Sequence, residues 1–170
     1  HLRRTTDRED HVLEGPARRL DLAESLKGLA RAVHERGDHG EAVRLYRRAR
    51  ALERLELPAE HPAALATLLD LAAALGDTGE ETTADSLFRY GLALERRALG
   101  EEHPEVAGDE TRYARLLHRW GNDPEAEALY RRSLAAMRRR LPAVHPLTAT
   151  TLLGLGELTL DRGAADRAEP

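Results

Sequence analysis

Apolar and small residues recur along the chain at fixed spacings, and the whole arrangement returns every 42 residues. Each copy has a Leu-Ala type pair, a glycine eight residues after the first member of the pair, an alanine five residues later, and an aromatic residue four residues after that. Spacings of three and four place side chains on one face of an α-helix. Each copy therefore predicts two α-helices, helix A and helix B, with a turn at the glycine between them.

Three copies of this pattern are complete and a fourth is partial. Small residues at fixed positions let antiparallel helices approach closely, and the aromatic residue of helix B is expected to fill the space between successive copies. The pairs are Leu29-Ala30, Leu71-Ala72, Tyr113-Ala114 and Leu155-Gly156, the glycines are Gly37, Gly79, Gly121 and Gly163, and the aromatic residues are Tyr46, Phe88 and Tyr130.

A His-Pro pair closes each complete copy. Proline cannot continue the helix before it but fits the first turn of the helix after it, so these pairs mark the boundaries between repeats. We interpret the histidines as structural, because equivalent positions one repeat apart in a stack point outward and do not converge on one site. The pairs are His61-Pro62, His103-Pro104 and His145-Pro146. The predicted organisation is the tail of a preceding degenerate repeat at 1–20, full repeats at 21–62, 63–104 and 105–146, and a partial repeat at 147–170.

The turn between helix A and helix B is clearest in the stretch GNDPEAEALYRRSL. Gly121 suits the left-handed conformation that ends many helices. Asp123 is expected to cap the next helix, and Pro124 fits the first turn of that helix. The third repeat therefore predicts a helix B that begins close to Asp123.

The order Leu-Ala, Gly, Ala, Tyr or Phe resembles the tetratricopeptide repeat (TPR), and the 42-residue period is similar to that of the longer kinesin light chain type. The resemblance implies an all-α fold: a right-handed TPR superhelix, or α-α solenoid, of antiparallel helix pairs. The chain departs from the pattern at two positions. After the turn, where the standard repeat prefers an aromatic residue, it has His39, Glu81, Asp123 and Ala165, and before the pair, where kinesin light chain repeats often have asparagine, it has Gly28, Asp70, Arg112 and Gly154.

The resemblance also implies a concave groove lined by helix A, in which such repeats hold a peptide or a helix of a partner protein. Counting along helix A from the buried pair predicts which side chains face that groove. Guanidinium groups form paired hydrogen bonds with carboxylates, so we expect an acidic or C-terminal segment as the ligand. The alternative is a solvated face with ion pairs inside each helix. The predicted groove residues are Lys27, Arg31, His34, Leu69, Arg115, His118 and Arg119.

Composition favours a folded chain with a protein partner. Hydrophobic residues make up 41% of the chain and charged residues 33%, without a low-complexity tract. The net charge of −4 argues against general binding to nucleic acid, which relies on clustered basic residues. The arginine-rich run YRRSLAAMRRR falls on the outer side of a predicted helix B and has no interleaved aromatic residues that would stack on bases. We expect no nucleic acid partner.

The sequence contains no motif typical of catalysis, a cofactor or a metal. His34 and His39 are five residues apart across the predicted turn, whereas pairs of zinc ligands on one helix are three or four apart. A phosphate-binding loop, a nucleophile elbow and cysteine are all missing. We therefore expect no enzyme activity, no cofactor and no metal.

The sequence gives little information about membrane association and about the source organism. No apolar run approaches the roughly 20 residues that span a bilayer, and the first residues lack the apolar core of a signal peptide. We expect no membrane partner and a cytoplasmic location. Lys27 is the only lysine among 26 basic residues, a bias that favours a GC-rich genome and an actinobacterial source.

The last helix A raises an alternative function. Leu152, Leu155 and Leu158 would normally pack on a helix B of their own repeat, and only the first residues of that helix follow. We predict that these leucines are covered by a longer parent chain or by a second copy. In bacteria, similar repeats resemble those attached to signalling ATPases and transcriptional regulators. The alternative is therefore an oligomerisation or regulatory arm of such a protein, which makes contact through uncapped solenoid ends.

Overall fold

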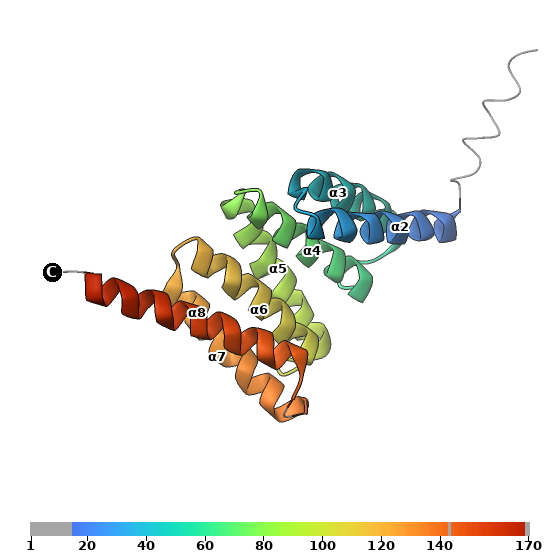
Figure 1. Cartoon of the computed structure of the whole chain (residues 1–170). Coiled ribbons are helices and arrows are strands. Elements are labelled where there is room, and N and C mark those ends of the chain that lie inside the picture. The colour runs from blue at the N-terminus through green and yellow to red at the C-terminus, as the bar shows by residue number, and fades with distance from the viewer. Residues whose placement is uncertain (1–14, 143, 169–170) are drawn as a thin grey trace, which may run out of the picture. The chain divides into compact units, whose positions relative to one another are not determined.

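The computed structural model of the chain describes residues 15–142 and 144–168, with side chains described as far as Gly163. Within these residues all regular secondary structure is α-helical, as the predicted all-α class requires (Figure 1). Residues 1–14 of the predicted preceding repeat lie outside the described residues. The helices are α2 (Pro16–Glu35), α3 (His39–Glu56), α4 (Pro62–Asp77), α5 (Glu81–Leu99), α6 (Pro104–Arg119), α7 (Asp123–Arg140) and α8 (Pro146–Ala168).

The chain divides into two compact units, residues 1–80 and 81–170. In the first unit α2 packs against α3, and α3 packs against α4. In the second unit α6 packs against α7, α7 packs against α8, and α5 and α8 both lie against α6. The helices A are α2, α4, α6 and α8, and the helices B are α3, α5 and α7. Each unit therefore buries its core by stacking helix pairs on their sequence neighbours.

Glycine forms the turn after α2, α4 and α6, as predicted. Gly37, Gly79 and Gly121 have φ angles of 86°, 87° and 80°, in the left-handed region that suits glycine. In each turn the amide of the following residue donates to the carbonyl oxygen five residues earlier, for example from Asn122 to Leu117 at 2.8 Å. These are Schellman bonds, which satisfy carbonyl groups at a helix end. The helix A, turn, helix B order is confirmed in the first three repeats.

The fourth predicted turn, at Gly163, is wrong, because α8 continues from Pro146 to Ala168. At the three observed turns a polar residue follows the glycine, whereas Gly163 is followed by two alanines, the residue with the highest helix propensity. A single glycine inside a helix costs only about 1 kcal/mol relative to alanine. The alanines therefore favour continuing the helix through this position.

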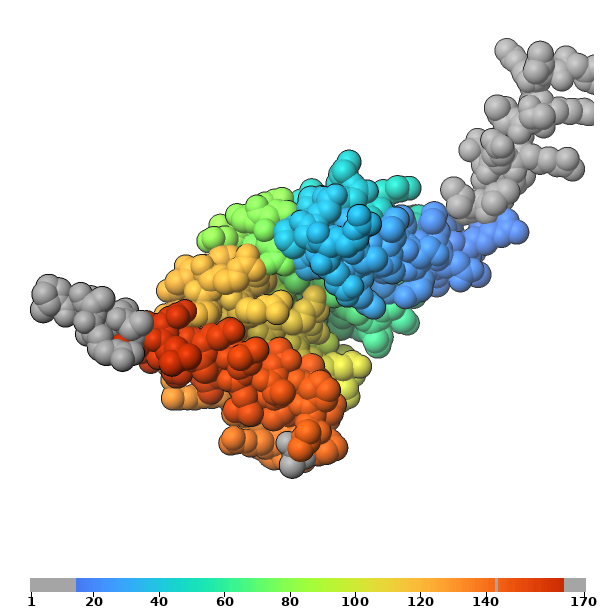
Figure 2. Space-filling model, in the orientation of Figure 1, coloured from blue at the N-terminus to red at the C-terminus, as the bar shows by residue number. Residues whose placement is uncertain are grey.

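The α8 leucines, predicted to need cover from outside this chain, differ in their exposure. Leu158 is fully buried and Leu155 is half-buried. Leu158 lies one turn after Gly154 and so shares the side of α8 that packs against α7, where Gly154 meets the Tyr130 ring. In the space-filling view α8 lies at the surface of the second unit (Figure 2). The exposed leucines of α8 are Leu152 at 46%, Leu153 at 63% and Leu160 at 69%.

The histidines of the His-Pro pairs cap the helices that begin at the prolines. Nδ1 of His61, His103 and His145 accepts a hydrogen bond from the backbone amide two residues ahead, at 3.2, 3.3 and 3.2 Å. Such a bond satisfies one of the amides left without a partner in the first turn of a helix. The structural role of these histidines is confirmed. Their capping hydrogen bonds were not predicted from the sequence.

Asp123 does not cap α7 as predicted. Asn122 occupies the N-cap position, and its side chain makes no capping hydrogen bond. Asp123 is the first helical residue, and its carboxylate contacts His118 instead. The equivalent turn in the first repeat differs, because Asp38 caps α3 by accepting a hydrogen bond from the Glu41 amide at 3.2 Å.

The first helix A begins earlier than predicted. Residues 16–20, assigned to the tail of a preceding repeat, form the start of α2. Leu29, predicted to be buried, is 53% exposed, whereas its equivalent Tyr113 is 2% exposed and stacks on Phe88 of the preceding helix B. Among the described residues no helix precedes α2, so nothing covers Leu29 in the same way.

The aromatic residues of helix B are buried, as predicted. Tyr46, Phe88 and Tyr130 are at most 1% exposed. Phe88 and Tyr113 stack with ring centroids 4.9 Å apart and an interplanar angle of 14°. Tyr130 reaches the next helix A, where a Cβ atom at Gly154 would lie 2.5 Å from its hydroxyl oxygen. In the second unit these rings therefore fill the space between successive repeats.

Candidate functional site

The predicted groove residues divide into three groups by exposure. Arg31, Arg115 and Arg119 are exposed, His34 and His118 are partly buried, and Lys27 and Leu69 are buried. An exposed side chain on helix A is available to a partner, whereas a buried one already packs inside the protein. The prediction of surface position therefore fails for two of the seven residues.

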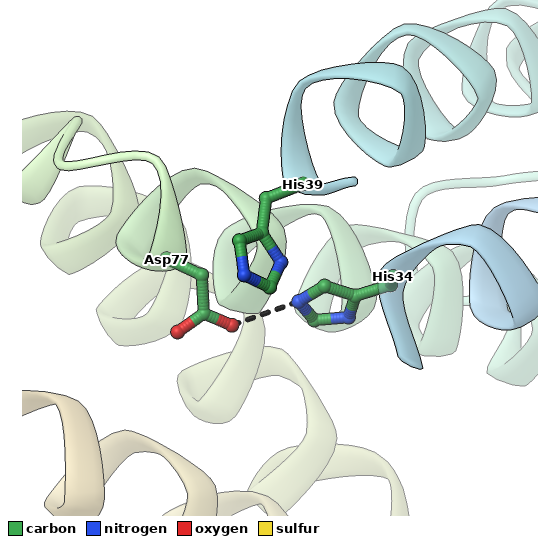
Figure 3. Close-up of side chains that lie close together, drawn as sticks. All are labelled: His34, His39 and Asp77. Atoms are coloured by element: carbon green, nitrogen blue, oxygen red, sulfur yellow. Dashed lines mark hydrogen bonds and ion pairs between the residues drawn. The ribbon is translucent and has the colours of Figure 1, made fainter. Parts of the chain in front are cut away.

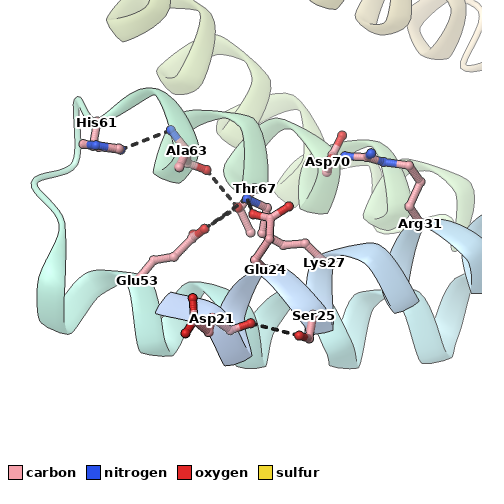
Figure 4. A network of polar contacts seen from close by, with 10 residues as sticks. All are labelled: Asp21, Glu24, Ser25, Lys27, Arg31, Glu53, His61, Ala63, Thr67 and Asp70. Carbon is pink, nitrogen blue, oxygen red and sulfur yellow. Dashed lines mark hydrogen bonds and ion pairs between the residues drawn. The ribbon is translucent and has the colours of Figure 1, made fainter. Parts of the chain in front are cut away.

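Lys27 forms ion pairs in the interior of the first unit. Only 6% of the residue is exposed, and its Nζ lies 2.8 Å from Glu24 Oε2 and 3.5 Å from Glu53 Oε1. The same Glu53 oxygen accepts a hydrogen bond from Thr67 Oγ1 at 2.8 Å (Figure 4). Lys27 thus compensates a carboxylate that is 2% exposed, because a buried charge is stable only with a partner. Lys27 was predicted to line the groove, but its side chain lies where α2, α3 and α4 meet.

Leu69 belongs to the core and does not line a surface. Its exposed fraction is 0%, and Ala73, one turn later on α4, is 6% exposed. Helix α4 carries apolar residues on most of its circumference, so the apolar patch predicted around Leu69 is largely buried. The exposed residue nearest to it on α4 is Ala66, which offers one methyl group.

Arg31 is exposed but has an acidic neighbour. Its side chain is 62% exposed, and its Nη2 lies 3.6 Å from Asp70 Oδ2 on α4 (Figure 4). The pair is long and its Arg31 end is open to water, which screens that charge, so it contributes little to stability. The guanidinium group of Arg31 therefore remains accessible to a second carboxylate.

Arg115 and Arg119 lie one turn apart on the exposed side of α6. The equivalent positions on α8, 42 residues later, are Glu157 and Asp161, which are also exposed. Because α6 and α8 pack against each other, a basic pair and an acidic pair occupy matching positions on two neighbouring helices. Burial raises the pKa of Tyr130 to about 12, and the charge of Arg115 lowers that pKa whereas the charge of Glu157 raises it.

His118 joins three helices of the second unit. Its Nδ1 lies 2.7 Å from Asp123 Oδ1 on α7, and its Nε2 lies 3.3 Å from Asp161 Oδ2 on α8. The hydrogen bond with Asp123, together with the nearby Asp161 carboxylate, raises the pKa of His118. Both ring nitrogens face carboxylates, so the imidazole serves as a cationic link between α6, α7 and α8.

His34 occupies the same repeat position in the first unit, with a different set of neighbours. Its Nε2 lies 2.8 Å from Asp77 Oδ2 on α4, and its ring meets the His39 ring edge to face at a centroid distance of 4.9 Å. Figure 3 shows the three side chains pointing toward one another from α2, α3 and α4. His34 and His39 are five residues apart in the sequence, a spacing that did not predict a metal site. Asp77 is the third member of the cluster, and the packing of α4 on the first repeat brings it next to the two histidines.

The described helices give no sign of a membrane span, because none of them is both long and apolar enough to cross a bilayer.

Comparisons with known proteins agree with this architecture. The tetratricopeptide repeat family model matches residues 22–63 and 64–105, one residue out of register with the predicted repeats 21–62 and 63–104. Among curated protein sequences, no relative matches the chain.

Solved structures with the same arrangement are also known. The nearly identical TPR-like repeats of a kinesin light chain type protein from Podosopora anserina align with a TM-score of 0.76 and 28% identity, covering 91% of this chain and 72% of that one. A form of that protein with a single substitution gives a TM-score of 0.75 at 28% identity, with 91% and 71% covered. BtubC (BKLC) from P. vanneervenii shares the fold with a TM-score of 0.75 at 19% identity, covering 91% of this chain and 61% of that one.

The sequence period, the glycine turns, the buried aromatic residues and these comparisons all lead to one assignment. The all-α helical repeat predicted from the sequence is confirmed by the helices of both units and by the solved structures that share the fold. The chain belongs to the tetratricopeptide repeat family, and its repeats are of the 42-residue, kinesin light chain-like type.

Proposed function

We propose that the chain binds a segment of a partner protein through exposed helix A side chains, with Arg115 and Arg119 as the principal contacts. Tetratricopeptide repeats generally mediate protein–protein interaction and are typically not enzymes. The observation that carries the proposal is the exposure of two guanidinium groups one turn apart on α6, beside an acidic pair on α8.

The chemistry of this surface favours a partner segment that carries carboxylates. Arginine presents a planar fork of donors that bonds a carboxylate in two places, and such charge-assisted bonds are about twice as strong as neutral ones. Glu157 and Asp161 occupy the matching exposed positions on α8, which packs against α6, so a basic residue next to the acidic residue of the partner segment would complement them. An acidic or C-terminal segment with a neighbouring cation is therefore the ligand that we propose.

Charge reversal of the arginine pair tests this proposal. We expect the Arg115→Glu, Arg119→Glu variant to bind the partner about tenfold more weakly or worse, because a charge-assisted hydrogen bond contributes roughly 1.5–3 kcal/mol. Partners are first captured from a lysate of the source organism and identified by mass spectrometry. The affinity of the captured protein for each variant is then measured by calorimetry.

A matched control carries the same change in charge on helix B. Arg131→Glu, Arg138→Glu alters two exposed arginines of α7 and should leave the affinity unchanged. Circular dichroism verifies that both variants keep their helix content. Equal binding by the wild type and the α6 variant would rule out this surface as the contact.

The exposed leucines of α8 support a second candidate function, self-association. Leu152, Leu153 and Leu160 are 46%, 63% and 69% exposed and lie on one helix. Large apolar side chains exposed on a helix favour burial against another protein surface. A second copy of the chain that covers this side of α8 is the simplest assembly of this kind, and it matches the regulatory or oligomerisation arm considered from the sequence.

Substitution of these leucines separates the two candidate functions. If the chain self-associates through α8, Leu153→Asp, Leu160→Asp should shift it to a monomer in sedimentation velocity, because an aspartate cannot be buried there without a partner. Leu55→Asp is the control, since Leu55 is 68% exposed but lies on α3. A wild-type protein that stays monomeric at high concentration would contradict self-association and leave the arginine surface as the candidate.

A further inference from the structure

We propose that His34, His39 and Asp77 bind a divalent transition-metal ion, and that Zn²⁺ fits this ligand set best. The residues come from the last turn of α2, the first turn of α3 and the last turn of α4 (Figure 3). A bound ion would therefore join both helices of the first repeat to helix A of the second. This site is separate from the arginine surface of the second unit and does not depend on partner binding.

The three ligand atoms are already close enough for a shared ion. They all lie within 4.8 Å of one another, with His34 Nε2 2.8 Å from Asp77 Oδ2. In a tetrahedral zinc site with bonds of about 2.0–2.2 Å, ligand atoms are roughly 3.4 Å apart. His34 and Asp77 would separate slightly and the His39 ring would move inward. Side-chain rotations of this size leave the three helices in place.

His39 provides a second, independent observation. Its Nδ1 is buried and has no hydrogen-bond partner within the described part of the chain. A buried polar atom without a partner destabilises the folded protein, and nearly all such atoms in proteins are paired. A cation in this cluster would give the nitrogen a partner. The His34 ring approaches the His39 ring edge to face, at an interplanar angle of 79°.

The ligand chemistry selects the class of ion. Two neutral imidazoles and one carboxylate carry a net charge of −1, which complements a divalent cation. Imidazole nitrogen suits zinc, nickel and copper, whereas magnesium and calcium prefer oxygen ligands alone. The side chains of His34 and Asp77 are 20% and 14% exposed, so solvent reaches the cluster and could supply a water molecule as the fourth ligand.

The equivalent cluster in the second unit explains why only one such site is proposed. His118, Asp123 and Asp161 stand 84 residues after His34, His39 and Asp77 in the sequence. There, aspartate replaces the second histidine, and the two carboxylates contact opposite nitrogens of the His118 ring. A protonated imidazole satisfies both carboxylates, so that cluster is complete without a metal.

Calorimetric titration of the untagged, chelator-treated chain with ZnCl₂ tests the proposal. We expect a tight Zn²⁺ site of one ion per chain that is lost in His39→Ala and in Asp77→Asn, with affinity falling by more than the ~10–100-fold typical of losing a second-shell partner. Zn²⁺ should also raise the melting temperature of the wild type but not that of His39→Ala. MgCl₂ should give no such site.

His103→Asn and His118→Gln are the matched controls. The first removes a histidine but keeps a good N-cap residue, and the second removes the equivalent histidine of the second unit. Both should bind Zn²⁺ as the wild type does. Circular dichroism confirms that every variant is folded before titration. Unchanged Zn²⁺ affinity in His39→Ala, or binding that disappears in His118→Gln instead, would overturn the proposal.

Discussion

Glu95→Gln should stabilise the protein at mildly alkaline pH and remove the part of the stability loss that we expect from Glu95 ionisation between about pH 5 and pH 8. Glu95 lies on α5, is 6% exposed, and faces acidic residues of α6. Burial, the charges of Asp109 and Glu105, and a hydrogen bond with Asp109 raise its pKa to about 8.

The sign of the effect follows from which state binds the proton. In the unfolded chain Glu95 ionises near its ordinary pKa of 4.5, whereas in the folded protein it stays protonated up to about pH 8. Between these values the folded state holds more protons, so the free energy of unfolding decreases as pH rises. The decrease should be on the order of 2 to 4 kcal/mol across this window.

Urea unfolding at several pH values, followed by circular dichroism, measures this difference. Glutamine has the shape of a protonated glutamate and can still donate to Asp109, so the variant should match the wild type at about pH 5 and exceed it at about pH 8.5. The pH dependence of stability must be compared between the wild type and Glu95→Gln, because His118 also makes stability depend on pH. The raised pKa of His118 contributes stability that is present at low pH and lost as pH rises through that pKa.

Glu101→Gln is the control for the loss of a negative charge, since Glu101 is exposed. It should leave the pH dependence unchanged. Parallel stability curves for the wild type and Glu95→Gln over the whole range would mean that Glu95 ionises normally in the folded protein.

Gly154→Ala should lower the free energy of unfolding by about 1–3 kcal/mol, although alanine is usually the better helix residue. A Cβ atom at this position would lie 2.5 Å from Tyr130 Oη, 2.6 Å from Cζ and 2.8 Å from Cε1. Real Cβ atoms do not approach other atoms so closely. Tyr130 is 1% exposed and enclosed by its neighbours, so relief requires α7 and α8 to move apart.

Gly156→Ala provides a matched comparison on the same helix. No atom lies within 4 Å of a Cβ built at Gly156, so the substitution should raise stability by about 0.5–1 kcal/mol through the helix preference of alanine. Thermal and urea unfolding of the two variants should therefore move in opposite directions. A stability of Gly154→Ala equal to that of Gly156→Ala would show that Tyr130 does not pack on this backbone.

Gly154 also illustrates what the sequence could not reveal. It occupies the position before the Leu-Ala pair, where the chain has Gly28 in the first repeat, and nothing in the sequence distinguishes the two glycines. A Cβ built at Gly28 meets no atom within 4 Å, whereas one at Gly154 meets the Tyr130 ring. The difference arises because Tyr130 of α7 precedes α8 in the stack, and no described helix precedes α2.

The prediction that Lys27 and Leu69 line the groove was wrong for a similar reason. Counting along one helix identifies the side that faces away from its own partner helix, and this is enough for Arg31, Arg115 and Arg119. It does not reveal what the neighbouring repeat places against that side. Glu53 and Thr67, which lie on two further helices, turn the Lys27 position into an interior ion pair.

The repeat period, the helix pairs and the first three turns could all be predicted from the sequence. These features depend on local rules: helical spacing of apolar residues, glycine where φ is positive, and proline where a helix starts. The cluster of His34, His39 and Asp77 could be found only in the folded protein. Those residues come from three helices, and their distances depend on how repeats stack, because contacts between repeats have no signature within a single helix.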